Sequence, residues 1–227
     1  MENYKDFVFI INGHNGAGKD TFVEKFKKAV CNEGMHYAVN NISTIDPIKE
    51  MINIPCLWNG ITKDDAARQL MHDIKEAVDK YSDYTTKYVV RKTIEHNEAM
   101  LNSDRVQHRD VSKYVGIPKD DTTIRTVTFI HCREPEKIRS IYRSFNERTY
   151  KRPISVETIL VRRDSDDIAS NAADQNVEDF MYDYYIDNNG TLSDLFDAAL
   201  ALKRKCDAYS DARSTSPYLP YTYYYND

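Results

Sequence analysis

The stretch GHNGAGKDT, residues 13–21, decides the fold that we predict for this chain. Its glycine and lysine spacing, GxxxxGK, is typical of a loop whose backbone N–H groups surround a phosphate while the lysine adds positive charge. The unbroken apolar run FVFII, residues 7–11, precedes it and predicts a central strand covered on both faces. TFVEKFKKAV, residues 21–30, follows it with apolar residues at helical spacing. Strand, glycine-rich loop and helix therefore occur in the order that a phosphate-binding loop requires.

The loop departs from the common pattern at its last position. Asp20 follows Gly18 and Lys19 where the common loop has Ser or Thr, and the hydroxyl comes one residue later, at Thr21. A carboxylate in the first helical turn suits the helix dipole, and Asp20 can have that role alone. Two functional interpretations stay open beside it. Asp20 can hold Mg²⁺ through a bridging water, or it can orient Lys19 or another basic residue.

Length and composition bound the class of protein. The chain has 227 residues, 41% hydrophobic and 30% charged, with a net charge of −5, which suits one globular domain and argues against a nucleic-acid polymer as partner. We find no apolar run of membrane-spanning length and no export signal, so we expect no membrane partner and a cytoplasmic location. The scattered cysteines at 31, 56, 132 and 206 lack metal or redox spacing and predict reduced thiols.

The rest of the chain alternates strand-like and helix-like segments. The predicted strands are YAVNNIS (37–43), RTVTFIHC (125–132), SVETILV (155–161) and YDYYID (182–187). The predicted helices are a short one opened by Pro47, one capped by Thr62 and Asp65, one through residues 88–101, one through 134–145 and a last one capped by Thr191 and Asp194. We expect an irregular loop over residues 102–124. This alternation predicts an α/β fold with a parallel sheet.

Helical spacing also predicts which side chains face the core. The sets are Ala67, Leu70, Met71, Ile74 and Val78; Ile138, Ile141, Tyr142 and Phe145; and Leu195, Phe196, Ala199 and Leu202.

The loop resembles that of the nucleoside monophosphate kinase superfamily, in which adenylate kinases carry Gly-Lys-Gly-Thr, so a hydroxyl one position late is normal there. The Gly-Lys-Asp-Thr form here is similar to that of phage-type deoxynucleoside monophosphate kinases, and animal-type phosphomevalonate kinases share its Gly-Lys-Asp core. The resemblance implies a three-layer P-loop NTPase fold, with a predominantly parallel five-stranded sheet, a helical acceptor-binding lobe and a lid. It also implies a metal held largely through water and by the phosphates.

Further segments resemble the phage enzymes in the same order. DPIKEMI (46–52) supplies Lys49, ARQLMHDI (67–74) supplies Arg68, FIHCREPEKI (129–138) supplies Arg133, and TILVRR (158–163) supplies Arg162 and Arg163. YDYYIDNNGTLSDL (182–195) is similar to a segment near which adenine sits in these kinases, and it contains Asn188. His131 stands where the family has an Asp that helps hold the metal's waters, so Glu134 or Asp20 would have to substitute.

The resemblance thus implies a set of site residues. Those for catalysis are Lys19, Arg133, Arg162 and Arg163. Those for ATP are Gly13, His14, Asn15, Gly16, Ala17, Gly18, Lys19, Asp20, Thr21 and Asn188. Those for the acceptor are Lys49, Arg68 and Arg133, and those for Mg²⁺ are Asp20, Thr21 and Glu134.

We expect one domain over residues 1–227, with the acceptor lobe within 46–125, the lid within 162–181 and a tyrosine-rich tail over 214–227. The tail is either an arm that packs on the core or on a second copy of the chain, as in a homodimer, or a loosely ordered end. The expected function is ATP-dependent phosphoryl transfer to a small phosphorylated acceptor, a nucleoside or deoxynucleoside monophosphate. The alternatives are a kinase of another phosphorylated metabolite, similar to phosphomevalonate kinase, and a non-catalytic nucleotide-binding regulatory or structural protein.

Overall fold

The structure is a computed structural model that describes residues 6–31, 37–53, 64–111, 125–150, 153–164 and 177–208. Several expectations fall outside these ranges: the Cys56 thiol, the cap at Thr62, residues 112–124 of the expected loop, residues 165–176 of the expected lid, and the tail over 214–227.

A five-stranded parallel sheet lies at the centre, in the order β2-β3-β1-β4-β5. Its strands are β1 (Asp6–Asn12), β2 (Tyr37–Ser43), β3 (Arg125–His131), β4 (Ile154–Arg162) and β5 (Tyr184–Asp187). Every residue of β1 is buried, as its apolar run predicts for a strand with neighbours on both sides and helices on both faces.

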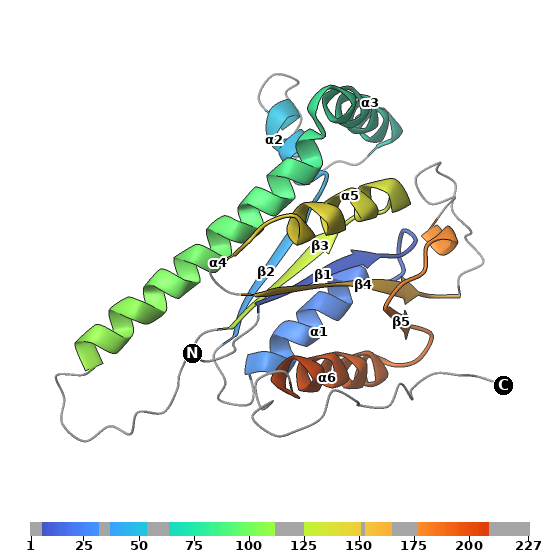
Figure 1. The fold of residues 1–227 in the computed structure, drawn as a ribbon. Coiled ribbons are helices and arrows are strands. Elements are labelled where there is room, and N and C mark those ends of the chain that lie inside the picture. The colour runs from blue at the N-terminus through green and yellow to red at the C-terminus, as the bar shows by residue number, and fades with distance from the viewer. Residues whose placement is uncertain are drawn as a thin grey trace.

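Helices cover both faces of the sheet (Figure 1). On one face, α1 (Lys19–Cys31) and α6 (Leu192–Ala208) pack on Phe7, Phe9 and Ile11 of β1. On the other face, α4 (Tyr84–Val111) and α5 (Pro135–Asn146) pack on Val8 and Ile10. Because successive residues of a strand point to opposite faces, one short strand anchors both cores. The predicted three-layer α/β fold with a parallel five-stranded sheet is confirmed.

Two further helices lie together near one end of α4 (Figure 1): α2 (Asp46–Asn53) and α3 (Asp65–Ser82). They share a small core of Ile48, Ile52 and Met71. A short 3₁₀ helix, η2 (Val177–Asp179), precedes β5.

The structure corrects two boundaries. Helix α3 is capped by Asp64, whose side chain accepts the Ala67 N–H at 2.8 Å. Helix α4 continues to Val111, so the expected loop over 102–124 is wrong for residues 102–111. That stretch is polar but contains no Gly or Pro to end a helix. The predicted box between Thr191 and Asp194 is confirmed, because each side chain accepts the other's backbone N–H.

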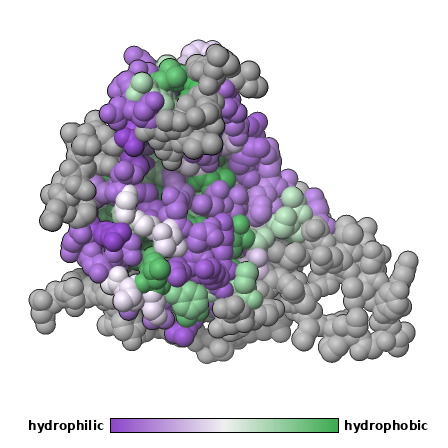
Figure 2. Space-filling model, turned by 180° about the vertical axis from the view of Figure 1, so that it is seen from behind, coloured by the Kyte–Doolittle hydropathy of each residue, from purple (hydrophilic) through white to green (hydrophobic). Residues whose placement is uncertain are grey.

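Burial agrees with the helical spacing at most of the predicted core positions. Two are wrong: Leu70 and Tyr142 are 37% and 46% exposed. Each lies beside the face of its helix that is buried. The buried residues on these faces include Met71 in α3 and Ile138, Ile141 and Phe145 in α5. Where the structure describes it, the face in Figure 2 is mostly hydrophilic, with hydrophobic residues in small patches. Among the described residues, no helix is both long and apolar enough to cross a membrane.

Candidate phosphate-binding site

The predicted loop lies at the carboxyl end of the central strand, at a switch point of the sheet. Helix α1 leaves β1 toward one face, and α5 leaves the neighbouring β3 toward the other. Open α/β sheets bind ligands outside the carboxyl ends of the strands at such a point. Two surface hollows lie away from it, one lined by Asp6, Asn97 and Tyr150 and the other by Lys27, Cys31 and Phe196.

The loop, residues 13–21, depends on its three glycines. Gly13, Gly16 and Gly18 have φ of 144°, 79° and 96°, which side chains rarely adopt. A Cβ on Gly13 would collide with the Val161 carbonyl oxygen, and one on Gly18 with the Asn188 amide. No atom of the described residues lies within 4 Å of a Cβ added to Gly16. Two glycines thus let the loop sit close to the ends of β4 and β5, and the third is at its open side.

Backbone donors gather where this loop enters α1. The first bond of the helix runs from the Phe22 N–H to the Gly18 carbonyl, at 2.8 Å. The N–H groups of Asp20 and Thr21 come before it and have no acceptor within the helix. The positive end of the helix dipole adds to them, so an anion is favoured here. Both residues have exposed side chains.

Lys19 folds back over the loop. Its ammonium group donates to the carbonyls of Gly13 and His14, the latter at 2.8 Å. The charge is thereby held against the loop backbone at Gly13 and His14. Asn188, just after β5, donates from its side chain to the Ala17 carbonyl at 2.9 Å and so ties the loop to the end of β5.

Arg162 ends β4 beside the loop and is held by two partners. It donates to Glu178 of η2 at 2.8 Å, and its guanidinium lies 4.6 Å from the centre of the Tyr185 ring. Glu178 also lies 4.0 Å from Nε2 of His14. Nε of Arg162 and Nδ1 of His14 are buried atoms that have no hydrogen-bond partner among the residues that the structure describes. Such orphaned atoms beside a phosphate loop fit a site that is completed by a ligand or by water. Arg163, the next residue, is exposed.

His131 ends β3 opposite the first turn of α1. Its Nε2 lies 2.8 Å from Oδ1 of Asn41 and 3.7 Å from Oδ1 of Asp20. Burial lowers the pKa of His131 below its ordinary value of 6.5, and this outweighs the opposing attraction of Asp20. The imidazole is therefore neutral at neutral pH, and it supplies no charge where the resembled family has a carboxylate.

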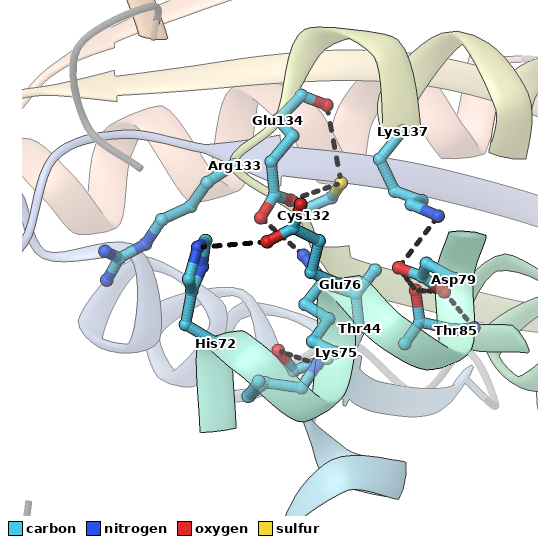
Figure 3. A network of polar contacts seen from close by, with 12 residues as sticks. Thr44, His72, Lys75, Glu76, Asp79, Thr85, Cys132, Arg133, Glu134 and Lys137 are labelled. Carbon is cyan, nitrogen blue, oxygen red and sulfur yellow. Dashed lines mark hydrogen bonds and ion pairs between the residues drawn. The ribbon is translucent and has the colours of Figure 1, made fainter. Parts of the chain in front are cut away.

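Glu134, the other acid considered for the metal, is bound to a lysine (Figure 3). It pairs with Lys75 of α3, and the Cys132 thiol lies within hydrogen-bonding distance of it, at 3.9 Å. Burial alone would raise the pKa of Glu134, but the charge of Lys75 lowers it overall. The neighbouring Arg133 extends away from this network (Figure 3). Among the described residues, no three His, Cys, Asp or Glu side chains gather as a ready-made metal site.

The two basic residues expected at the acceptor pair within their own helices. Lys49 lies 3.0 Å from Asp46 in α2, and Arg68 lies 3.1 Å from Asp65 in α3. Both are one-turn surface pairs, which hold a side chain only weakly, so their assignment to the acceptor stays a prediction.

Three residues of the site were not singled out in the sequence: Asn12, Glu178 and Tyr182. Asn12 is the last residue of β1 and fully buried, with hydrogen bonds to three chain segments. A polar residue that ends an apolar run just before a glycine-rich loop was the available signal. Glu178 and Tyr182 carried none, since only the fold brings them to the loop.

Comparison with known proteins adds little to this geometry. No protein-family model matches the chain. No curated protein sequence matches it either. Among solved structures, it is similar to the APS kinase CysC of Mycobacterium tuberculosis, in a cysteine-to-alanine mutant, with a TM-score of 0.39 and 10% sequence identity over 88% of this chain and 99% of that one. So distant a similarity says nothing about substrate, and the function has to be argued from the chain's own residues.

Proposed function

We propose that this protein is an ATP-dependent phosphotransferase. It would bind the phosphates of ATP in the loop over residues 13–21 and transfer the γ-phosphoryl group to a small phosphorylated acceptor, a nucleoside or deoxynucleoside monophosphate. The observation that carries the proposal is the loop itself. The Lys19 ammonium and the N–H groups in the first turn of α1 both lie at this loop, at the carboxyl end of the central strand.

Phosphoryl transfer needs positive charge around the three equatorial oxygens and little covalent help from the protein. Lys19 would serve the terminal phosphates, and Arg162, with its orphaned Nε, would stabilise the charge that develops on the transferring group. Arg133, just beyond the end of β3, would bind the acceptor phosphate. Arg163 and the acceptor residues Lys49 and Arg68 complete the assignment as predictions from the resemblance.

Mg²⁺ would lie between the phosphates and the first turn of α1. The Thr21 hydroxyl and the Asp20 carboxylate would hold it, since Asp20 is exposed, whereas Glu134 is paired with Lys75. Mg²⁺ keeps several of its waters, so one carboxylate acting through water suits it. When bound, the ion would neutralise charge on the phosphates.

The first experiment measures the affinity of the folded protein for ATP and ADP by calorimetry, with Lys19→Ala as the test variant. Loss of a charge-assisted contact should weaken binding by about 1.5–3 kcal/mol. Lys27→Ala is the matched control, because Lys27 lies on the same helix in an exposed pair with Glu24 and should leave the affinity unchanged. Equal ATP affinity in the parent and in Lys19→Ala would remove the proposal.

A second experiment identifies the acceptor. ADP release from ATP and Mg²⁺ is followed across nucleoside monophosphates, their deoxy forms and phosphomevalonate. Turnover with a nucleoside monophosphate supports the proposal, and turnover with phosphomevalonate alone would move the protein to the other class of kinase.

One observation favours a second candidate, a nucleotide-binding protein without rapid turnover. Neutral His131 leaves the end of β3 without the acidic group that the resembled kinases have there. Binding of ATP with no ADP release for any acceptor, and with no gain from His131→Asp, would favour this candidate over the enzyme.

A further inference from the structure

A buried set of polar contacts lies directly behind the loop, centred on Asn12. The amide nitrogen of Asn12 lies 2.9 Å from the Arg133 carbonyl and 2.6 Å from the Tyr182 hydroxyl. Its side-chain oxygen accepts the Gly13 N–H at 2.7 Å. Asn12 is fully buried and Tyr182 is 6% exposed, so water does not compete for these groups.

The partners fix the direction of each hydrogen bond. The Gly13 N–H can only donate and the Arg133 carbonyl can only accept, so just one orientation of the Asn12 amide satisfies both. The Tyr182 hydroxyl donates to the Val177 carbonyl at 2.9 Å and hence accepts from Asn12. Any shift of one segment would leave buried polar groups unpaired, which costs more than the bond itself contributes.

These contacts join three parts of the proposed site that lie far apart in the sequence. Gly13 begins the loop, and Arg133 follows β3. The segment from Val177 to Tyr182 carries Glu178, which lies against both Arg162 and His14. The Tyr182 ring is itself fixed by Phe180 and Tyr185, with centroids 4.9 and 6.0 Å away.

We propose that Asn12 and Tyr182 are positioning residues, which fix the start of the phosphate loop relative to Arg133 and to the segment from Val177 to Tyr182. The inference rests on the proposed function, because it concerns how well the loop binds phosphate. Neither residue touches the ligand. Each acts through another group, Asn12 through the Gly13 peptide and Tyr182 through Asn12.

A purely structural role makes a different prediction from a positioning role. Buried hydrogen bonds that only stabilise the core lower the free energy of unfolding when removed, but the folded protein keeps its nucleotide affinity. A positioning role lowers the affinity of the folded protein as well, because the backbone N–H groups of the loop no longer start from one fixed arrangement.

The experiment compares Tyr182→Phe with Tyr184→Phe by calorimetry with ADP, alongside urea unfolding. Both variants remove one phenol hydroxyl and keep the ring, but Tyr184 donates to Glu157 at 2.6 Å, away from the loop. We expect Tyr182→Phe to raise the Kd for ADP about 5-fold, the equivalent of about 1 kcal/mol. Tyr184→Phe should change the Kd less than about 2-fold, even where it costs as much stability.

Asn12→Leu extends the test, because leucine is similar in size to asparagine but makes none of the three hydrogen bonds of Asn12. If it folds, its Kd should rise further, and adding Tyr182→Phe to it should change little, since Tyr182 acts through Asn12. If Asn12→Leu does not fold, the comparison of Tyr182→Phe with Tyr184→Phe is the test of the positioning role.

A Tyr182→Phe protein that loses stability but binds ADP like the parent overturns the positioning role and leaves the proposed function intact. A parent that binds neither ADP nor ATP overturns both.

Discussion

Asp20 and His131 face each other between the first turn of α1 and the end of β3, with Oδ1 of Asp20 3.7 Å from Nε2 of His131. This is not an ion pair at neutral pH, because burial lowers the pKa of His131. The Nε2 atom also lies nearer to Asn41, at 2.8 Å. Asp20 therefore keeps an exposed carboxylate beside the loop over residues 13–21, and we propose that this carboxylate serves as an outer partner of Mg²⁺.

Asp20→Asn should raise the Mg²⁺ concentration needed for turnover, or for nucleotide affinity if turnover is absent. Removal of an outer-shell metal partner costs about 10- to 100-fold in metal affinity or activity. Metal-free nucleotide binding should be unchanged or tighter, because the substitution removes a negative charge near the phosphates. The measurement is an Mg²⁺ titration of each protein at fixed nucleotide.

Asp20→Ser sharpens this test, since it restores the common ending of the loop and places a hydroxyl for direct ligation. It should recover part of the Mg²⁺ response that Asp20→Asn loses. If Asp20→Asn titrates like the parent, the carboxylate serves only the helix dipole and the metal is held elsewhere.

The sequence predicted the parts of the fold that depend on local pattern. The apolar run of β1, the glycines of the loop and the capping box of α6 each act within a few residues, and all appear in the structure. The expected loop over 102–124 is wrong at 102–111, because a polar stretch without Gly or Pro does not by itself stop a helix.

The site was predictable only where one segment carries it. The loop and its lysine are contiguous, whereas the partners of Arg162 and Glu134 come from η2, β5 and α3. Glu134 illustrates the difference. Its place after β3 suggested a metal partner, but the fold brings the buried Lys75 to it, and no short-range pattern encodes that contact.

Arg133→Ala should raise the KM for the acceptor far more than the Kd for ATP. Loss of a charge-assisted contact to the acceptor phosphate predicts a rise of about 10- to 100-fold, with the affinity for ATP within about 2-fold of the parent. Arg139→Ala is the control, because Arg139 is an exposed arginine of α5 paired with Glu136. An effect of Arg133→Ala on stability alone would make Arg133 a structural residue.

Glu178→Gln should tighten the binding of ATP and ADP. On the proposed function, Glu178 would compete with phosphate for Arg162, which it contacts at 2.8 Å, and its charge would oppose an anion in the loop. Both side chains are over 40% exposed, so the pair contributes only about 0.2–1 kcal/mol and the gain in affinity should be up to about 5-fold.

The gain from Glu178→Gln should shrink at high salt, where exposed charges are screened. Calorimetry at low and high ionic strength measures this gain in nucleotide affinity. Asp179→Asn is the control, because it removes the charge of a neighbouring acid. Equal gains in the two variants would mean that net charge, and not the contact with Arg162, is responsible.

Glu134→Gln should lower the stability of the protein at neutral pH and flatten its loss in acid. Lys75 is 8% exposed and would be left without the carboxylate, although the Glu134 side chain is 40% exposed, so we expect a cost of about 1–2 kcal/mol. The pKa of Glu134 is lowered from 4.5 by Lys75, against the opposing effect of burial. A lowered pKa in the folded state means that the stabilisation is fully present above pH 4.5 and is lost as pH falls through the folded value. Urea unfolding of parent and variant between pH 7 and pH 3 should therefore show a difference in the free energy of unfolding that is constant above pH 4.5 and narrows below it.

The control is Glu136→Gln, in the exposed pair with Arg139. It should change the free energy of unfolding by less than about 0.5 kcal/mol at every pH. A gap between parent and Glu134→Gln that stays the same down to pH 3 would show that Lys75 does not stabilise the charged form of Glu134.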